Sequence, residues 1–169
     1  MDIQNIYNSI AELSREIVRE CTARSVKIST AESCTGGMIS GAVTSISGSS
    51  AVIELGVCSY SNRIKHEILH VPAEVLKQFT EYSVECAAEM AKGVMELSGA
   101  DYGVSTTGVA GPTGGSAEHP VGEVCIAVSG RNGCRSERFL FAQGSADREL
   151  IRALAAEKAL SMLLCEIKK

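Results

Sequence analysis

The stretch Val26-Lys27-Ile28-Ser29-Thr30-Ala31-Glu32-Ser33-Cys34-Thr35-Gly36-Gly37 decides the fold. Its first five residues predict a short strand, and the residues that follow Gly37 predict a helix of small and apolar side chains through about Ile46. The run Ser47-Gly48-Ser49-Ser50 then ends that helix. A strand, a glycine-containing loop and a helix in this order are typical of α/β proteins, in which ligands bind where the strand ends.

The segments on either side continue the alternation of helices and strands. We predict helices from Ile3 to about Cys21, over one or two turns in 62–70, over 83–97, and from about Ala146 to Glu166, and we expect Pro72 to start a separate segment. We predict strands over 51–60, 102–107, 122–129 and 134–141, the last two forming a hairpin signalled by Asn132-Gly133. The expected fold is a single domain over residues 1–169, a three-layer α/β/α sandwich with a mixed, mostly parallel central sheet.

Composition narrows the class of protein. A chain of 169 residues, 45% of them hydrophobic, is long enough to bury a core without metals or disulfides. Its net charge of −4 provides no basic field for nucleic acid or an anionic membrane. The sequence contains no apolar run of membrane-spanning length and no signal-peptide pattern. We therefore expect a cytoplasmic protein with no nucleic-acid or membrane partner.

The cysteines and histidines indicate neither a disulfide framework nor a metal site. The seven cysteines form no C-x-x-C pair, and the three histidines do not complete a zinc-ligand spacing. We interpret most of the cysteines as reduced, buried apolar residues and expect no metal or cofactor.

Ser33 is the first candidate for chemistry, because it follows a predicted strand and precedes a predicted helix. Its hydroxyl can attack a carboxamide carbon while nearby backbone N–H groups, including those at the helix N-terminus, hold the oxyanion. Gly36 and Gly37 leave room for a substrate beside those groups. Alternatively, Ser33 only caps the helix, since serine is a preferred cap residue. We interpret Glu32 as a solvated or hydrogen-bonded loop carboxylate.

Lys65 is the second candidate, in the run Tyr60-Ser61-Asn62-Arg63-Ile64-Lys65. A serine nucleophile needs a base, no histidine lies in an obvious triad pattern, and a lysine kept neutral by burial can replace it. The alternative is an ordinary solvated surface lysine beside His66. Tyr60 is either part of the core edge or a ring that orients a bound base.

The glycine-rich run Thr107-Gly108-Val109-Ala110-Gly111-Pro112-Thr113-Gly114-Gly115 is the third candidate. Glycines after a strand let backbone N–H groups approach an anion such as phosphate, and Thr107 can add a hydroxyl. The run matches neither a P-loop nor a dinucleotide fingerprint, so an ordinary loop remains an alternative.

Two arginines and a histidine complete the candidates. Arg148 and Arg152 lie one helical turn apart and share a face of the last helix, where a guanidinium can grip phosphate. The alternative is ordinary surface charge, which we favour for Arg152 more than for Arg148. We expect His119 in an exposed loop.

With these residues described, the chain resembles the C-terminal domain of the CinA competence/damage-inducible family, in its stand-alone, PncC-type form, over nearly its whole length. The matching runs are Thr30 to Gly37, Tyr60-Ser61-Asn62 with Lys65, Thr107 to Gly115, and Pro120-Val121-Gly122. The resemblance implies hydrolysis of nicotinamide mononucleotide to nicotinate mononucleotide and ammonia in pyridine nucleotide salvage, without a cofactor. It also implies a mixed-sheet α/β/α fold and commonly a homo-oligomer.

The resemblance also implies roles for individual residues. It makes Ser33 the nucleophile, Lys65 its base and Thr107 a catalytic contact. It implies a substrate-binding set of Thr35, Gly36, Gly37, Tyr60, Gly108, Ala110, Gly111 and Arg148. The chain departs from the family pattern at Leu69-His70-Val71 and at Thr80-Glu81-Tyr82-Ser83, changes that we expect to affect loop geometry and a subunit contact.

The sequence leaves three hypotheses for the function. The first is amide hydrolysis through Ser33 and Lys65, with either a covalent acyl-enzyme or direct attack by water. The second is a nucleotide-binding or adaptor protein without catalysis, linked to competence or the DNA damage response. The third is hydrolysis of another amide or of a phosphoanhydride. Ammonia release from nicotinamide mononucleotide separates the first from the others.

Overall fold

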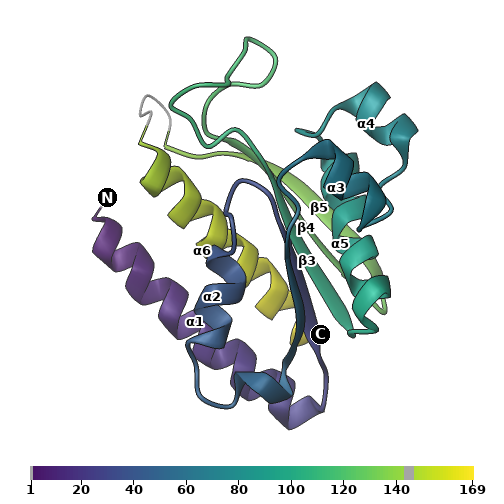
Figure 1. The fold of residues 1–169 in the computed structure, drawn as a ribbon. Helices are drawn as coiled ribbons and strands as arrows, with labels where there is room; N and C mark the ends of the chain where they lie inside the picture. The colour runs from purple at the N-terminus through teal and green to yellow at the C-terminus, as the bar shows by residue number, and fades with distance from the viewer. Residues whose placement is uncertain (1, 143–146) are drawn as a thin grey trace.

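The computed structural model describes residues 2–142 and 147–169, and its centre is a five-stranded sheet in the order β2-β1-β3-β4-β5 (Figure 1). The strands are β1 (Ile28–Glu32), β2 (Ile53–Cys58), β3 (Tyr102–Gly108), β4 (Glu123–Gly130) and β5 (Gly133–Leu140). β1 pairs in parallel with both β2 and β3, whereas β4 is antiparallel to β3 and to β5. Four strands of this sheet therefore share a direction, which confirms the mixed, mostly parallel arrangement.

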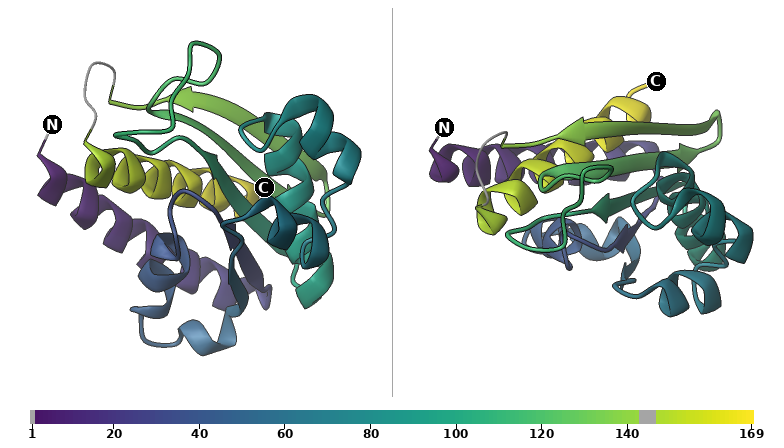
Figure 2. Two further views of the ribbon diagram at one scale, coloured as in Figure 1. Left: turned by 45° about the horizontal axis from the view of Figure 1, so that its top comes forward. Right: turned by 90° about the horizontal axis from the view of Figure 1, so that it is seen from above.

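Helices cover both faces of the sheet (Figure 2). One face carries α1 (Ile3–Arg24), α2 (Met38–Thr44) and α6 (Arg148–Ile167), while the other carries α3 (Asn62–Glu67), α4 (Ala73–Phe79) and α5 (Val84–Ser98). A short 3₁₀ turn, η1 (Ser49–Ala51), leads into β2. This arrangement confirms the three-layer α/β/α fold. Among the described residues, we find no helix whose length and hydropathy would let it span a bilayer.

The two helical layers pack against the sheet in different ways. The layer of α1 and α6 buries branched and long apolar side chains, among them Ile17 and Leu160, against β4 residues such as Ile126. On the other face, α5 approaches β3 closely where the contact residues are small. A Cβ atom on Gly103 of β3 would lie 2.1 Å from the Ala91 carbonyl oxygen of α5. The close approach of α5 fixes the position of the segments before it, which carry part of the site.

The predicted and observed elements differ mainly at their ends. β1 begins at Ile28 rather than Val26 and continues through Glu32, so that Ser33 directly follows it. In the hairpin, Arg131 and Asn132 form the loop and Gly133 takes a φ of +110° as the first residue of β5. The predicted start of the last helix at Ala146 lies outside the described residues, and the helix is described from Arg148.

Candidate active site

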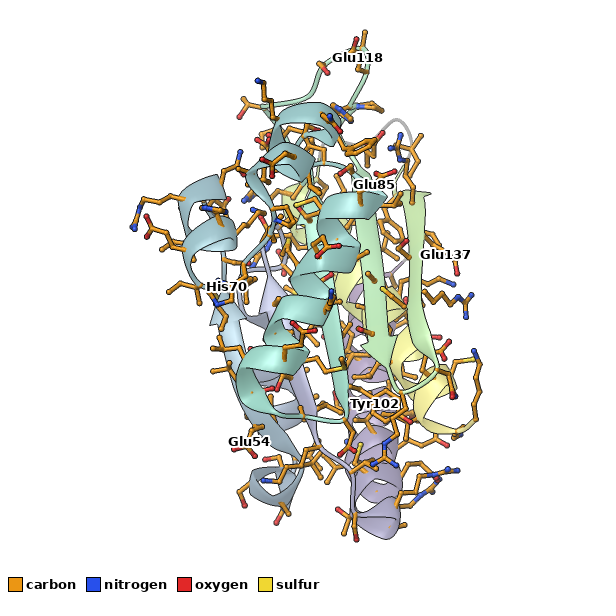
Figure 3. The ribbon with its side chains drawn as sticks, turned by 90° about the vertical axis from the view of Figure 1, so that its right-hand side faces the viewer. Glu54, His70, Glu85, Tyr102, Glu118 and Glu137 are labelled. Carbon is orange, nitrogen blue, oxygen red and sulfur yellow. The ribbon has the colours of Figure 1, made fainter. Side chains whose placement is uncertain are left out.

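A cavity of about 310 Å³ opens where β1, β2 and β3 end. This is the end of the sheet where Glu118 marks the long β3–β4 loop, opposite the end marked by Glu54 and Tyr102 (Figure 3). The predicted residues in its wall are Ser33, Tyr60, Lys65, Gly108, Ala110 and Arg148. Residues that the sequence did not single out as contacts are Cys34, Ser61, Asn62, Glu81 and Tyr82. The cavity is large enough for a small-molecule ligand.

Ser33 and Lys65 meet inside this cavity. The Lys65 Nζ atom donates a hydrogen bond of 3.2 Å to Ser33 Oγ and another of 3.0 Å to the carbonyl oxygen of Ser59. The Ser33 amide donates to the Thr106 carbonyl on β3, which fixes the position of the hydroxyl at the strand end. Ser33 does not cap α2, whose N-cap is Gly37. The pair therefore has the spacing of a nucleophile and its base.

Lys65 is buried, with 1% of its surface exposed, so the interpretation as a solvated surface residue is wrong. It lies on α3, a short helix capped by the Ser61 hydroxyl. Burial lowers the pKa of the Lys65 amine, while Cys86, Glu81 and Cys34 act in the opposite direction. Removing the charged amine from water favours its neutral form, which is the form able to accept a proton.

Glu32 has a structural role that the sequence did not predict. Its carboxylate is 1% exposed and accepts hydrogen bonds from the amides of Gly37, Ile39 and Ser40 at 2.8–3.0 Å. These amides form the N-terminus of α2, so Glu32 occupies the donors that we expected a ligand to use. Glu32 is thus hydrogen-bonded rather than solvated, and the α2 N-terminus is closed by the protein itself.

The loop after Ser33 is held by contacts on the side away from the cavity. Thr35, Gly36 and Gly37 do not line the cavity. The Thr35 hydroxyl donates to Glu32 and lies 2.7 Å from the Thr106 hydroxyl. Gly36 and Gly37 have φ angles of +61° and +92°, which glycine adopts without strain. Substrate contact by these three residues stays a prediction; their placement gives them a supporting role.

Arg152 clamps the same loop. Its Nε atom donates to the Cys34 carbonyl at 3.1 Å, and Nη2 donates to the Thr35 carbonyl at 2.7 Å. Our preference for Arg152 as ordinary surface charge was therefore wrong, because two directed hydrogen bonds tie α6 to the loop that carries Ser33.

Arg148 lies one turn earlier and at the cavity wall. Nη1 donates to the Gly111 carbonyl at 2.6 Å, and Nη2 donates to the Tyr60 hydroxyl at 3.0 Å. Tyr60 is 63% exposed, so it belongs to the cavity mouth and not to the core edge. Three segments distant in sequence are thereby joined at the mouth, where an arginine can meet an anion.

The glycine-rich segment that follows β3 forms another part of the cavity wall. The Val109 amide donates to the Glu123 carbonyl, and the Gly122 amide donates to the Val109 carbonyl, so Val109 is tied to the start of β4. Its neighbours Gly108 and Ala110 line the cavity. Gly108 has no space for a side chain, since a Cβ there would lie 2.2 Å from the Glu123 carbonyl oxygen. The glycine at this position is thus required by the packing of β3 on β4, and close approach of the backbone to a ligand stays a prediction.

Thr107 is 1% exposed and lies behind the cavity wall. Its hydroxyl donates to the Glu81 carbonyl at 2.5 Å. A catalytic role for Thr107 stays a prediction, and the observed bond positions the segment that contains Glu81.

No group of three or more His, Cys, Asp or Glu side chains gathers as a metal site within the described residues.

Comparison with known proteins gives this geometry a context. The pattern of the CinA C-terminal domain family matches residues 10–167. The chain belongs to this family. As a CinA domain it is 46% identical over 160 residues to a protein of Enterobacter agglomerans named nicotinamide-nucleotide amidohydrolase PncC, covering 94% of this chain and 95% of that protein.

Other relatives of this CinA domain are longer. A CinA-like protein of Geotalea daltonii is 46% identical over 140 residues, which are 83% of this chain but 33% of that protein. Among solved structures, the competence/damage inducible protein CihA of Agrobacterium tumefaciens superposes with a TM-score of 0.90 at 42% identity, covering 95% of this chain and 96% of that one. A CinA superfamily protein of Klebsiella pneumoniae superposes with a TM-score of 0.88 at 33% identity, covering 94% and 98%.

The segment before α5 supplies the cavity residues that sequence reasoning missed in this CinA domain. Glu81 and Tyr82 line the cavity, and the Tyr82 ring packs against His119 with ring centroids 5.3 Å apart. His119 Nδ1 lies 2.8 Å from the Glu123 carboxylate. His119 is therefore partly buried and packed, and the expectation of an exposed loop histidine is corrected. The one signal in the sequence was the departure of Thr80-Glu81-Tyr82 from the family pattern.

Proposed function

We propose that this protein hydrolyses the carboxamide of nicotinamide mononucleotide to give nicotinate mononucleotide and ammonia, in pyridine nucleotide salvage. One observation carries the proposal: the buried Lys65 amine lies 3.2 Å from the Ser33 hydroxyl in the wall of a ligand-sized cavity. The 46% identity to the Enterobacter agglomerans nicotinamide-nucleotide amidohydrolase, over nearly the full length of both chains, supports the choice of substrate.

The mechanism follows from the protonation state of Lys65. A neutral Lys65 accepts the proton of Ser33 Oγ as this oxygen attacks the carboxamide carbon. The resulting oxyanion takes hydrogen bonds from backbone N–H groups of the cavity wall, of which that of Cys34 directly follows the nucleophile. Lys65 then returns the proton to the leaving nitrogen, ammonia departs, and water attacks the acyl-enzyme with Lys65 again as base.

The remaining cavity residues bind the rest of the substrate. Arg148 and the glycine-rich wall at Gly108 to Gly111 face an anionic group at the mouth, where we assign the 5′-phosphate. The exposed Tyr60 ring lies beside Arg148 and can cover the ribose or the base. Thr107 acts from behind the wall by holding the Glu81 carbonyl.

The test is product formation by the purified chain. We expect stoichiometric ammonia and nicotinate mononucleotide from nicotinamide mononucleotide, at the same rate with and without a chelator. Binding of the nucleotide without product would contradict the proposal and favour a nucleotide-binding adaptor. If the chain released phosphate from a nucleotide, or ammonia from another amide, faster than ammonia from nicotinamide mononucleotide, that compound would be the better candidate for the substrate.

A second measurement separates covalent catalysis from direct attack by water. Rapid acid quenching during turnover, followed by mass spectrometry of the peptide that contains Ser33, should show the acyl adduct. Turnover without an adduct at any quench time would favour activated water, with Ser33 as a hydrogen-bonding group.

The assembly and the location of the protein stay predictions. We expect a homo-oligomer in the cytoplasm, acting on a small molecule without nucleic acid or membrane. Sedimentation of the purified chain tests the assembly, and a mass equal to that of one chain would contradict it.

A further inference from the structure

The segment Thr80-Glu81-Tyr82 places a carboxylate and an aromatic ring in the cavity wall. It connects α4 to α5, and Thr80 has a φ of +65°, which is unusual for a β-branched residue and turns the chain sharply. The backbone is anchored on the core side: the Glu81 carbonyl accepts from Thr107, and the Tyr82 carbonyl accepts from the Cys125 thiol at 3.3 Å. Both Glu81 and Tyr82 line the cavity.

The Glu81 carboxylate carries a charge that no ion pair neutralises. It accepts a hydrogen bond of 3.2 Å from Asn62 Nδ2, and the ion pairs of the described residues do not include it. Burial raises the pKa of Glu81, but hydrogen bonds from its own amide and from the side chains of Asn62 and Tyr82, together with the positive charge of Lys65, outweigh burial and hold the pKa below its ordinary value. Glu81 is therefore ionised at neutral pH.

The two cations of the cavity wall make their hydrogen bonds elsewhere, and Lys65 attracts Glu81 only through its charge, without an ion pair. Arg148 bonds to Gly111 and Tyr60 at the mouth, and Lys65 bonds to Ser33 and the Ser59 carbonyl. Of the charged groups that line the cavity, Glu81 alone is negative among the described residues. A ligand that fills the cavity removes water from this carboxylate, which costs free energy unless the ligand brings a positive charge or donors.

We propose that Glu81 and Tyr82 form a cation subsite that selects the positively charged pyridinium ring over neutral aromatic amides. This inference rests on the proposed function, because the ring belongs to the nicotinamide nucleotide. The carboxylate attracts the ring cation, and the Tyr82 ring adds a cation–π or stacking contact. With Arg148 assigned to the phosphate and Glu81 to the ring, the cavity offers one charge of each sign to a substrate that carries one of each.

The subsite also fits the chemistry at Ser33. A cationic ring bound beside Lys65 further disfavours the protonated amine, because like charges repel in a partly buried site. A neutral amide provides no such effect and brings no positive charge to Glu81, which then keeps only its interactions within the protein. A cation bound at Glu81 therefore opposes the effect by which Glu81 itself raises the pKa of Lys65.

Two ligands of matched shape test the inference. One is nicotinamide mononucleotide, and the other is benzamide riboside 5′-monophosphate, in which carbon replaces the ring nitrogen and the ring is neutral. Their dissociation constants are measured by calorimetry with the Ser33→Ala protein, which does not consume the substrate. The ratio of the two constants cancels structural effects that are common to both ligands.

We expect the Ser33→Ala protein to bind the cationic nucleotide roughly tenfold more tightly than its neutral isostere. Adding Glu81→Gln should bring the ratio to within about twofold of one, whereas Glu81→Asp should preserve most of the preference. The matched control is Glu85→Gln, an exposed carboxylate one turn further along at the start of α5, which should keep the ratio (Figure 3).

An equal preference in the Ser33→Ala protein and its Glu81→Gln variant would overturn the inference, and so would the absence of a preference in the former. The proposed function fails separately, if the protein with Ser33 intact binds nicotinamide mononucleotide but releases no ammonia from it.

Discussion

The Lys65 amine lies 3.2 Å from the Ser33 hydroxyl oxygen across 32 positions of sequence. The two residues come after different strands of the sheet. Ser33 directly follows β1, and Lys65 lies on α3, the helix after β2. Parallel pairing of β1 with β2 brings the ends of these two strands to the same edge of the sheet, with Glu32 opposite Cys58. The proposed catalytic pair is thus brought together by the sheet topology.

Replacing Lys65 by methionine should abolish turnover while leaving the fold intact. Methionine fills a similar volume and removes the cost of burying an amine, so the melting temperature should stay equal or rise. Loss of the base should lower kcat by roughly 10²- to 10⁴-fold. The exposed Lys77→Met is the control and should keep full activity. If the Lys65→Met protein turned over substrate as fast as the Lys77→Met control, Lys65 would not be the base.

The pH dependence of kcat/KM should show the lowered pKa of Lys65. Burial lowers this pKa below the ordinary 10.5, against opposing effects of Cys86, Glu81 and Cys34. Only the neutral amine accepts a proton, so kcat/KM should rise with pH through the folded-state pKa and reach a plateau below pH 10.5. A profile that rises steadily up to the ordinary lysine range would show that Lys65 does not titrate in this way.

Glu32→Ala should destabilise the protein strongly. It would remove the acceptor of three α2 amides and of the Thr35 and Ser40 hydroxyls, and leave those donors buried. We expect a loss of about 3 kcal/mol in the free energy of unfolding, and a drop of roughly 10 °C in Tm for a domain of this size. Glu54→Ala, on the exposed part of β2, should change stability little (Figure 3). Equal Tm values for the two variants would contradict the capping role.

Arg148→Ala and Arg152→Ala should have different kinetic effects, although they lie one turn apart on α6. Loss of Arg148 removes a cation at the cavity mouth and should raise KM roughly tenfold with a small change in kcat. Loss of Arg152 frees the Cys34 and Thr35 carbonyls and should lower kcat more than it changes KM, because the Ser33 loop loses its position. The same change of KM in both variants would contradict this division.

Gly93→Ala should disrupt the layer that carries Lys65. A Cβ at Gly93 of α5 would lie 1.9 Å from the Leu69 carbonyl oxygen, and backbone there would have to move. We expect a loss of roughly 2 kcal/mol or more in stability. Gly41→Ala on α2 is the matched control, since no atom lies within 4 Å of its added Cβ. The control should gain up to about 1 kcal/mol from helix propensity. Chemical denaturation of both variants measures the difference.

The order and type of the elements could be predicted from the sequence because they depend on local patterns. The apolar spacing along Ile3 to Cys21 and the alternation of strands and helices are visible in short windows. The ends were less certain: β1 extends to Glu32 because its pairing with β2 and β3 continues there, and such pairing is not visible in one segment.

The site was predicted where a motif marked it and missed where only the fold creates it. Ser33, Tyr60, Lys65 and Arg148 all reach the cavity, as expected from their runs. Nothing local to Arg152 indicates that it faces two loop carbonyls 117 and 118 residues away. Glu32 similarly resembles any loop carboxylate until the amides of α2 surround it. Glu81 lies at the cavity on a segment that is held by Thr107 of β3, a contact between residues 26 positions apart.

The most direct test of the central claim is the rate of ammonia release from nicotinamide mononucleotide by the Ser33→Ala protein, measured beside the unmodified chain at saturating substrate. We expect a fall of about 10³-fold or more, with the same thermal unfolding and with binding of the nucleotide retained. Release within tenfold of the unmodified rate would contradict it, because the oxygen that Lys65 contacts would then not be needed for the reaction.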